Sequence, residues 1–207
     1  MADKFKVLLV KHGACQEIIE WVGDRSMARA WKECPRSDWM LWLSRILGLL
    51  TERQLRELAV DFAEHILPIF EKQYPTDRRP RLAIQAARDF AAGKYGKEIL
   101  AAHAADADHA GDAAQSDAAG AHNFDAAHAA HAASRAAYAA SAAASAYIFD
   151  ATHAGYHASY AAYSADADHA GDAAGAYAKE KKWQADQIRK MLPRPKEHAA
   201  ARAARRA

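Results

Sequence analysis

The chain is poor in the residues that cross-link small secreted proteins and in those that interrupt helices. Its 207 residues include only two cysteines, Cys15 and Cys34, and six prolines. Two cysteines are too few for the disulfide framework on which small secreted domains depend. No N-terminal segment combines a basic start, an apolar stretch and a small-residue cleavage site. We therefore expect a cytoplasmic protein with both thiols reduced.

Long hydrophobic runs and common catalytic signatures are also missing. The longest apolar run, near residues 39–50, is interrupted by Ser44 and Arg45, whereas a membrane-spanning helix needs about 20 apolar residues. We expect no membrane segment. The sequence contains no glycine-rich phosphate loop, no paired CxxC and no GxSxG elbow, which excludes the usual signatures of nucleotide hydrolases, zinc or redox sites and α/β-hydrolases.

Positive charge is nearly absent from the middle of the chain. Residues 98–178 carry 1 Lys or Arg against 10 Asp or Glu, whereas residues 1–97 carry 17 against 13 and residues 179–207 carry 10 against 3. The formal net charge of +2 conceals this asymmetry. It suits a charged partner, but the basic ends can equally well neutralise the acidic middle within the fold.

Residues 1–97 are predicted to form a tryptophan-rich region of short helices. The predicted helix starts are Asp24 or Ser26, then Ser37 or Asp38, then the Thr51–Gln54 capping box, and Gly93 is a predicted helix end. Apolar residues recur at helical spacing, and no segment alternates as a strand does. The expected inner faces are Trp39, Trp42, Leu43, Ile46 and Leu50 in one helix, and Leu55, Leu58, Phe62 and Ile66 in the next.

Residues 98–192 are predicted to form an alanine-rich helical bundle. Alanine supplies 37 of the 81 residues in 98–178, a stretch with no proline and with no leucine after Leu100. Alanine has the best intrinsic helix propensity. One helix over this stretch would be roughly 120 Å long, so we expect helical hairpins. In 179–192 we expect Trp183, Ile188 and Leu192 in the core and the basic residues outside. Residues 193–207 are predicted to be a disordered basic tail.

The predicted fold class is therefore all-α, with an N-terminal bundle of short helices packed against long alanine-rich hairpins. Within the latter, the decamer ADADHAGDAA occurs twice, at 105–114 and 165–174. On a helical wheel, small residues occupy one side of the first copy and acidic residues the opposite arc. We interpret the repeat as a packing unit with a solvated outer face. The inner side comprises Leu100, Ala104, Ala107, Ala110, Gly111, Ala114 and Ala118, and the outer arc Asp106, Asp108, His109 and Asp112.

Aspartate and histidine also recur at helical spacing, which is compatible with a metal site in a helical bundle. The small-residue stripe must face inward for the bundle to close, so a solvated face is the favoured interpretation and neither a metal nor another cofactor is predicted. The sets are Asp106, His109 and Asp112; Asp166, His169 and Asp172; Asp125, His128 and His131; and Asp150, His153 and His157.

Two further candidates carry an alternative structural interpretation. Arg78, Arg79 and Arg81 are a candidate ligand-binding cluster, because guanidinium groups bind phosphate or carboxylate with two hydrogen bonds. They can equally well pair with nearby aspartates. His12 and Cys15 have the spacing of a base and a nucleophile, but no residue that would orient the base is identifiable. We predict no catalytic residues.

His103 is a separate case, because it falls on the alanine stripe near Ala107 and Ala110. There it is either a hydrogen-bonded core residue or, alternatively, a ligand or base. A lone histidine on such a face is more often a core residue, which is the interpretation we favour.

Three stretches carry a resemblance to a known family: HGACQEIIEW, AWKECPRSDWMLWL and DRRPRLAIQAARDFAAGK, followed by an Ala, Tyr and His-rich helical half. With these, most of residues 8–180 resembles the immunity protein family of bacteria and their mobile elements. The stretch from Asp38 to Trp42 is the most specific feature. The resemblance implies an all-helical, non-catalytic protein that binds and neutralises a cognate toxin.

From the acidic arc we expect a basic toxin, such as a nuclease, as partner, because complementary charge speeds association. Direct nucleic-acid binding is not expected, and the oligomeric state stays open. The alternative is a metal-dependent hydrolase or a small-ligand or nucleotide-sequestering protein that uses the Asp/His helices or the arginine cluster. The expected partner-binding residues are Asp106, Asp108, Asp112, Asp166, Asp168 and Asp172.

Overall fold

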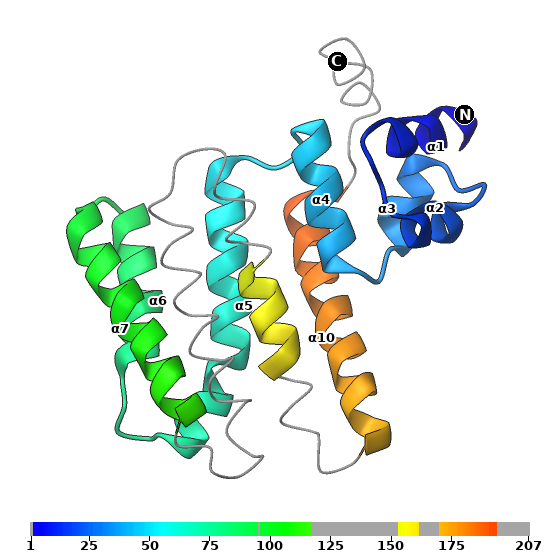
Figure 1. The fold of residues 1–207 in the computed structure, drawn as a ribbon. Coiled ribbons are helices and arrows are strands. Elements are labelled where there is room, and N and C mark those ends of the chain that lie inside the picture. The colour runs from blue at the N-terminus through cyan, green and yellow to red at the C-terminus, as the bar shows by residue number, and fades with distance from the viewer. Residues whose placement is uncertain (1, 95, 117–152, 162–169, 194–207) are drawn as a thin grey trace.

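The computed structural model describes residues 2–94, 96–116, 153–161 and 170–193, and the part of the chain that it describes is helical with no strand (Figure 1). The all-α prediction is confirmed. A further helix, residues 153–161, carries no label in the figure. The labelled helices are α1 (Ala2–Lys11), α2 (Gln16–Val22), α3 (Met27–Glu33), α4 (Ser37–Leu47), α5 (Glu52–Gln73), α6 (Arg79–Ala91), α7 (Lys97–Ser116) and α10 (Ala170–Met191).

The labelled helices pack in a series. α7 contacts α6, α6 contacts α5, α5 contacts α10, and α10 contacts α4. The short helices α1–α3 lie beside α4 at one end of the series, and the helix of residues 153–161 lies beside α5 and α10 (Figure 1). α10 therefore joins the two parts of the sequence that the domain prediction separates at residue 97, and that division stays a prediction.

The short helices begin and end at recognisable signals. The Ser26 side chain caps α3 by accepting from the Arg29 amide, and Gly48 ends α4 in the left-handed conformation at φ 58°, which glycine adopts without a Cβ clash. The sequence patterns assigned no element to residues 1–11, because FKVLLV is a short apolar run that periodicity alone does not resolve. It forms most of α1, which buries Phe5, Leu8 and Leu9.

In α4 the predicted inner face is only partly correct. Trp39 and Leu43 are buried, but Trp42 and Ile46 are half-buried and Leu50 lies beyond the end of the helix. Met40, Leu41 and Leu47, which the stripe omitted, are buried instead. The physical reason is that α4 lies between α1–α3 and α10, so two faces of the helix are covered rather than one.

The structure of α5 agrees with the capping box and the inner face predicted from the sequence. Thr51 and Gln54 form the capping box, and the predicted inner residues Leu55, Leu58, Phe62 and Ile66 are all buried. Pro68 is exposed within the helix. Each of these apolar side chains contributes about 1.5–3 kcal/mol when it is fully removed from water, so α5 is a central element of the core.

α6 and α7 form a close hairpin, which is the most extensive contact between labelled helices. The predicted alanine stripe faces inward: Leu100, Ala104, Ala107, Ala110, Gly111 and Ala114 are buried, whereas Ala118 lies outside the described residues. Small side chains let two helices approach closely, which replaces side-chain burial by contact between backbones.

The two copies of the decamer differ in environment where both are described. Ala114 in the first copy is buried, at 1% exposed, whereas Ala174, the corresponding residue of the second copy, is exposed near the start of α10. The first copy lies inside α7, while residues 165–169 of the second lie outside the described residues. The two copies therefore pack differently at this position, although their sequences are identical.

No helix among the described residues is both long enough and apolar enough to span a membrane. The predicted cytoplasmic location stays a prediction, and the predicted tail of residues 194–207 lies outside the part that the structure describes.

Candidate functional site: a polar network at the junction of α4, α5 and α10

A buried hydrogen-bond network centres on Gln184 of α10. Its Oε1 accepts from Ser37 Oγ at 2.7 Å, and its Nε2 lies 2.9 Å from the carbonyl oxygen of Gly155 and 3.0 Å from Glu180 Oε1. Ser159 Oγ donates to the same Gly155 carbonyl at 2.8 Å. Because an unsatisfied buried polar group costs about 1–3 kcal/mol, these partners fix how α4, α10 and residues 153–161 pack.

Gly155 allows this approach because it has no side chain. A Cβ at that position would lie 2.9 Å from Gln184 Oε1 and 3.2 Å from a ring carbon of Phe62. Both neighbours are fully buried. Residues 153–161 can therefore approach α5 and α10 closely only with glycine at this position.

The network reaches the surface through Glu180 and His65. The Glu180 side chain is 4% exposed, and its Oε2 lies 3.2 Å from Nε2 of His65, whose side chain is partly exposed. The imidazole of His65 stacks on Trp183 with ring centroids 3.7 Å apart and planes 10° from parallel. The buried carboxylate thus has an amide donor on one side and an imidazole nitrogen on the other.

A second set of charges surrounds Asp38 at the start of α4. Arg36 donates two hydrogen bonds to its carboxylate, at 3.0 and 2.7 Å, and Lys181 Nζ lies 3.6 Å from Oδ1. Burial alone would raise the pKa of Asp38, but the hydrogen bonds from Arg36 and the charge of Lys181 bring it below its ordinary value. Burial lowers the pKa of Lys181, whose side chain is only 5% exposed.

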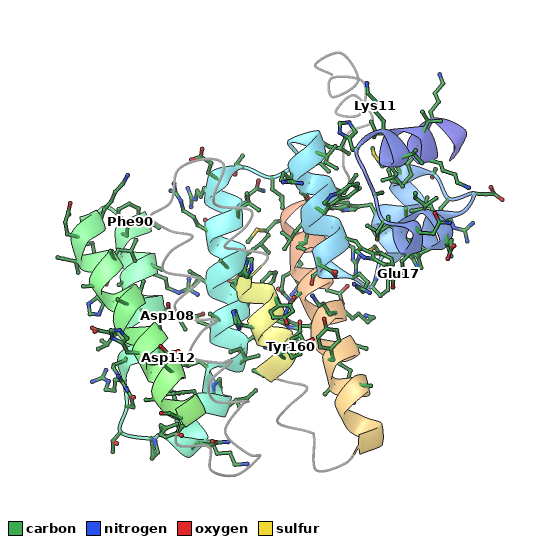
Figure 2. All side chains as sticks on the ribbon, in the orientation of Figure 1. Lys11, Glu17, Phe90, Asp108, Asp112 and Tyr160 are labelled. Carbon is green, nitrogen blue, oxygen red and sulfur yellow. The ribbon has the colours of Figure 1, made fainter. Side chains whose placement is uncertain are left out.

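Three tyrosines extend this site along α10 and residues 153–161. Tyr156 stacks obliquely on Tyr160 with ring centroids 4.5 Å apart, and Tyr160 meets the edge of Tyr177 at 5.6 Å. Figure 2 shows Tyr160 next to α10. Burial and the charge of Asp38 raise the pKa of Tyr177. Tyr177 therefore remains neutral near pH 7 and offers a ring and a hydroxyl group rather than charge.

The predicted acidic arc lies elsewhere, on the outer side of α7, where Figure 2 labels Asp108 and Asp112. Asp106 and Asp112 are exposed and Asp108 is half-buried. Asp166 and Asp168 lie outside the described residues. Asp172 lies in α10, but its side chain is not described. The first copy therefore presents its acidic residues to solvent, and a joint surface with the second copy stays a prediction.

The arginine cluster is mostly paired within the protein. Arg79 donates to Asp77 at 2.6 Å and Arg81 to Glu71 at 2.6 Å, while Arg78 is exposed at the start of α6. The hydrogen bond from Arg79 lowers the pKa of Asp77. A ligand would have to displace these carboxylates. Pairing with carboxylates of the protein itself therefore accounts for two of the three guanidinium groups.

Among the described residues, no group of three or more His, Cys, Asp or Glu side chains is arranged to hold a metal ion. His153 and His157 are described and half-buried, whereas Asp125, His128, His131, Asp150 and His169 lie outside the described residues. His103 is half-buried on α7.

The two cysteines differ in environment. Cys15 is exposed at the start of α2. Cys34 is buried, donates to the carbonyl oxygen of Arg36, and has a pKa raised to about 11 chiefly by burial. A thiol with such a pKa is almost wholly protonated at neutral pH and is a poor nucleophile. The described part of the chain shows no hydrogen bond between His12 and Cys15.

The polar network itself was missed by the sequence patterns. The basic residues of α10 were expected outside, but Lys181 is buried, as are Glu180 and Gln184. The error has a physical reason: a helical wheel assigns charged residues to solvent unless their partners are known, and Asp38 and Ser37 lie more than 140 residues earlier in the sequence. The pattern of Ser37 and Asp38 in front of an apolar helix predicted that one of them caps it, which is wrong: α4 begins at Ser37 with Arg36 at the cap position. The Ser37 side chain bonds Gln184 instead, and that of Asp38 bonds Arg36.

Comparison with known protein families gives one match. A model of the Imm-5 like putative immunity protein family matches residues 45–191, which is more than half of the chain. The chain belongs to this family. Neither curated proteins nor solved structures give a match.

The range matched by the family model covers only part of the polar network of this immunity-family protein. His65, Gly155, Lys181 and Gln184 lie inside the matched range. Asp38, within the stretch that suggested the resemblance, lies before its first residue. The matched range thus contains most of the network, and α1–α3 with most of α4 lie outside it.

Proposed function

We propose that this protein protects a bacterial cell by binding a cognate protein toxin and neutralising it without catalysis. Membership of an immunity family over residues 45–191 is the observation that carries the proposal. The helical architecture supports it, because a helical bundle with a close-packed interior presents a preformed surface and so loses little conformational entropy on binding.

The acidic arc of α7 is the surface that we propose for the toxin. Asp106 and Asp112 are exposed on a helix whose opposite side packs on α6, so a partner can approach without disturbing the core. Complementary charge raises the association rate and makes it sensitive to salt. A basic toxin, such as a nuclease, has the matching charge.

The test is a rescue experiment with the toxin encoded beside the gene for this protein. Co-expression should restore growth, and the purified proteins should co-elute in size-exclusion chromatography at low salt, with less complex at high salt. Absence of both rescue and complex would contradict the proposed function.

The surface is tested separately with charge variants of α7. Asp106→Asn should slow association with the toxin by about twofold or more at low salt, since rim charges act mainly on the association rate. Asp24→Asn is the matched control, because Asp24 is an exposed carboxylate in the turn between α2 and α3, and these helices lie at the other end of the helix series from α7. Equal effects of both variants would indicate a general charge effect and would contradict the assignment to the arc.

A further inference from the structure

Two helices at opposite ends of the helix series carry exposed aliphatic side chains. On α1, Val7 is 65% exposed and Val10 is 58% exposed, and on α7 Ile99 is 45% exposed. Figure 1 shows α1 beyond α4 and α7 beyond α6, with α5 and α10 between them. The opposite side of each helix is buried in the core, so the packing of the described residues does not account for these aliphatic groups.

Lysines surround the two valines of α1. On a helical wheel the exposed residues of this helix share one arc, opposite its buried residues. We call this arc the α1 face, and its members are Lys4, Lys6, Val7, Val10 and Lys11. The two valines and the lysines beside them line a shallow hollow. Within the part of the chain that the structure describes, no carboxylate forms an ion pair with these lysines, so the α1 face is both apolar and positively charged.

The outer side of α7 has a similar arrangement with the opposite charge. Exposed small and aliphatic residues lie on one arc with exposed carboxylates. We call this arc the α7 face, and its members are Glu98, Ile99, Ala102 and Asp106. Lys97 lies outside the arc. The charge of Arg79 acts on Asp106, but its guanidinium group pairs with Asp77. The α7 face is therefore apolar and negatively charged.

The spacing along the two faces matches. Lys4 and Lys11 are seven residues apart, which is about 10.5 Å along a helix axis, and Glu98 and Asp106 are eight residues apart, which is about 12 Å. On each helix the aliphatic residues lie between the charged ones. Two helices side by side can thus bring the valines onto Ile99 while a lysine meets a carboxylate at each end.

We propose that the α1 face of one copy of this chain binds the α7 face of a second copy. A contact between two α1 faces would place lysines opposite lysines, and a contact between two α7 faces would place carboxylates opposite carboxylates. Like charges in an interface are unfavourable, so both symmetric pairings are disfavoured. The described residues of the chain itself provide the complementary surface, and this self-association is independent of the proposed function.

The contact generates chains of molecules rather than closed dimers. The two faces lie at opposite ends of the helix series, so each copy that binds through one face keeps the other face free, as in other heterologous contacts. One helix against one helix is a smaller contact than the about 1,200–2,000 Å² of stable interfaces. We therefore expect a weak association, with a Kd of about 1 mM at low salt. Because Asp106 also belongs to the acidic arc, self-association would compete with the partner that we propose for the arc.

Sedimentation equilibrium of the purified protein tests the association. At about 1 mM protein and about 20 mM salt, the weight-average mass should be about twice the 22.6 kDa of one chain, as open-ended association with this Kd requires. In about 500 mM salt the mass should fall towards that of one chain, because exposed charges are then screened. A mass of one chain under all conditions, or a mass that does not change with salt, would overturn the proposal.

Two variants each block one face. Val7→Asp places a carboxylate in the α1 face, and Ile99→Asp does so in the α7 face, so each variant alone should associate at least about tenfold more weakly. An equimolar mixture should have a mass between one and two chains, because Val7→Asp keeps its α7 face and Ile99→Asp keeps its α1 face. Full association of either variant alone, or no pairing in the mixture, would overturn the proposal.

Tyr156→Asp is the matched control. Tyr156 is 43% exposed and lies in residues 153–161, beside α5 and α10 and between the two ends of the series. This variant should associate as the unchanged protein does, and an equal loss of association would overturn the assignment to the two faces. Thermal melts show which variants are folded. If an aliphatic variant is unfolded, Lys11→Glu and Asp106→Lys repeat the mixing experiment through charge alone, with the same expected results.

Discussion

The indole Nε1 of Trp31 in α3 donates a 2.9 Å hydrogen bond to the carbonyl oxygen of Leu192, 161 residues further along the chain. Next to it, Arg189 donates to the carbonyl oxygens of Trp31 and Cys34 at 3.2 and 2.8 Å. The C-terminal end of α10 thus satisfies carbonyl groups at the end of α3, and it connects the short helices to the rest of the protein.

Arg189→Ala tests this connection. The substitution leaves two carbonyl oxygens without their charged donor, so we expect the free energy of unfolding to fall by about 1.5–3 kcal/mol. Lys190→Ala is the matched control, because the neighbouring Lys190 is exposed and donates to the side chain of Gln187; its effect should be about 0.5 kcal/mol or less. Urea denaturation measures both, and equal effects would contradict a structural role for Arg189.

Gly155→Ala should lower the free energy of unfolding, whereas Gly175→Ala should raise it. At Gly155 the new Cβ meets Gln184 and Phe62, so we expect a loss of about 1–3 kcal/mol from overpacking. At Gly175 no atom lies within 4 Å of a built Cβ, so the better helix propensity of alanine should stabilise α10 by up to about 1 kcal/mol. Thermal melts that show stabilisation at both positions would contradict the close approach at Gly155.

Asp38→Asn and Lys181→Met separate the two charges of the polar network. Asp38→Asn leaves the buried ammonium group of Lys181 without its carboxylate, and we expect a loss of about 3 kcal/mol at pH 7. Lys181→Met removes the buried charge while Asp38 keeps Arg36, so stability should stay the same or rise. Urea denaturation at pH 7 checks both.

The pH dependence follows from the lowered pKa of Asp38. Because the folded pKa is below the unfolded value of about 3.9, the carboxylate contributes stability above about pH 4 and loses it as the pH falls through the folded pKa. The difference between the unchanged protein and Asp38→Asn should therefore narrow on acidification below about pH 4. A difference that stays constant down to pH 2.5 would contradict the ion pair.

Ala110→Leu and Asp106→Asn test the two sides of α7. Ala110 is 1% exposed, so the larger side chain should cost about 1–3 kcal/mol by overpacking the contact with α6. Asp106 is exposed, and its replacement should change stability by about 0.5 kcal/mol or less. If the arc were a metal or catalytic site, Asp106→Asn would instead abolish activity, whereas Ala110→Leu would be tolerated. Thermal melts and toxin rescue distinguish these results.

The sequence predicted the parts of the fold that depend on local chemistry. The capping residue Thr51 and the small-residue face of α7 follow from hydrogen-bonding capacity and helical periodicity, and the structure confirms them. Of the two predicted caps for α3, Asp24 and Ser26, the structure shows Ser26. Both signals lie within a few residues of the feature that they indicate.

The polar network could not be predicted in this way. Burial of Lys181 and Gln184 depends on Asp38 and Ser37, and on a glycine at position 155 that lets another helix approach. None of these partners is close in sequence, and polar residues in a helix are ordinarily solvated.

The central claim, neutralisation by binding without catalysis, is tested most directly by titrating a fixed amount of the neighbouring toxin with this protein and measuring the remaining toxin activity. The account predicts a linear loss of activity that ends at a fixed molar ratio of about one and does not change with incubation time, because each molecule of the protein occupies one toxin. Toxin activity that continues to fall with time at a small fraction of an equivalent, or that persists at a large excess of this protein, would contradict it.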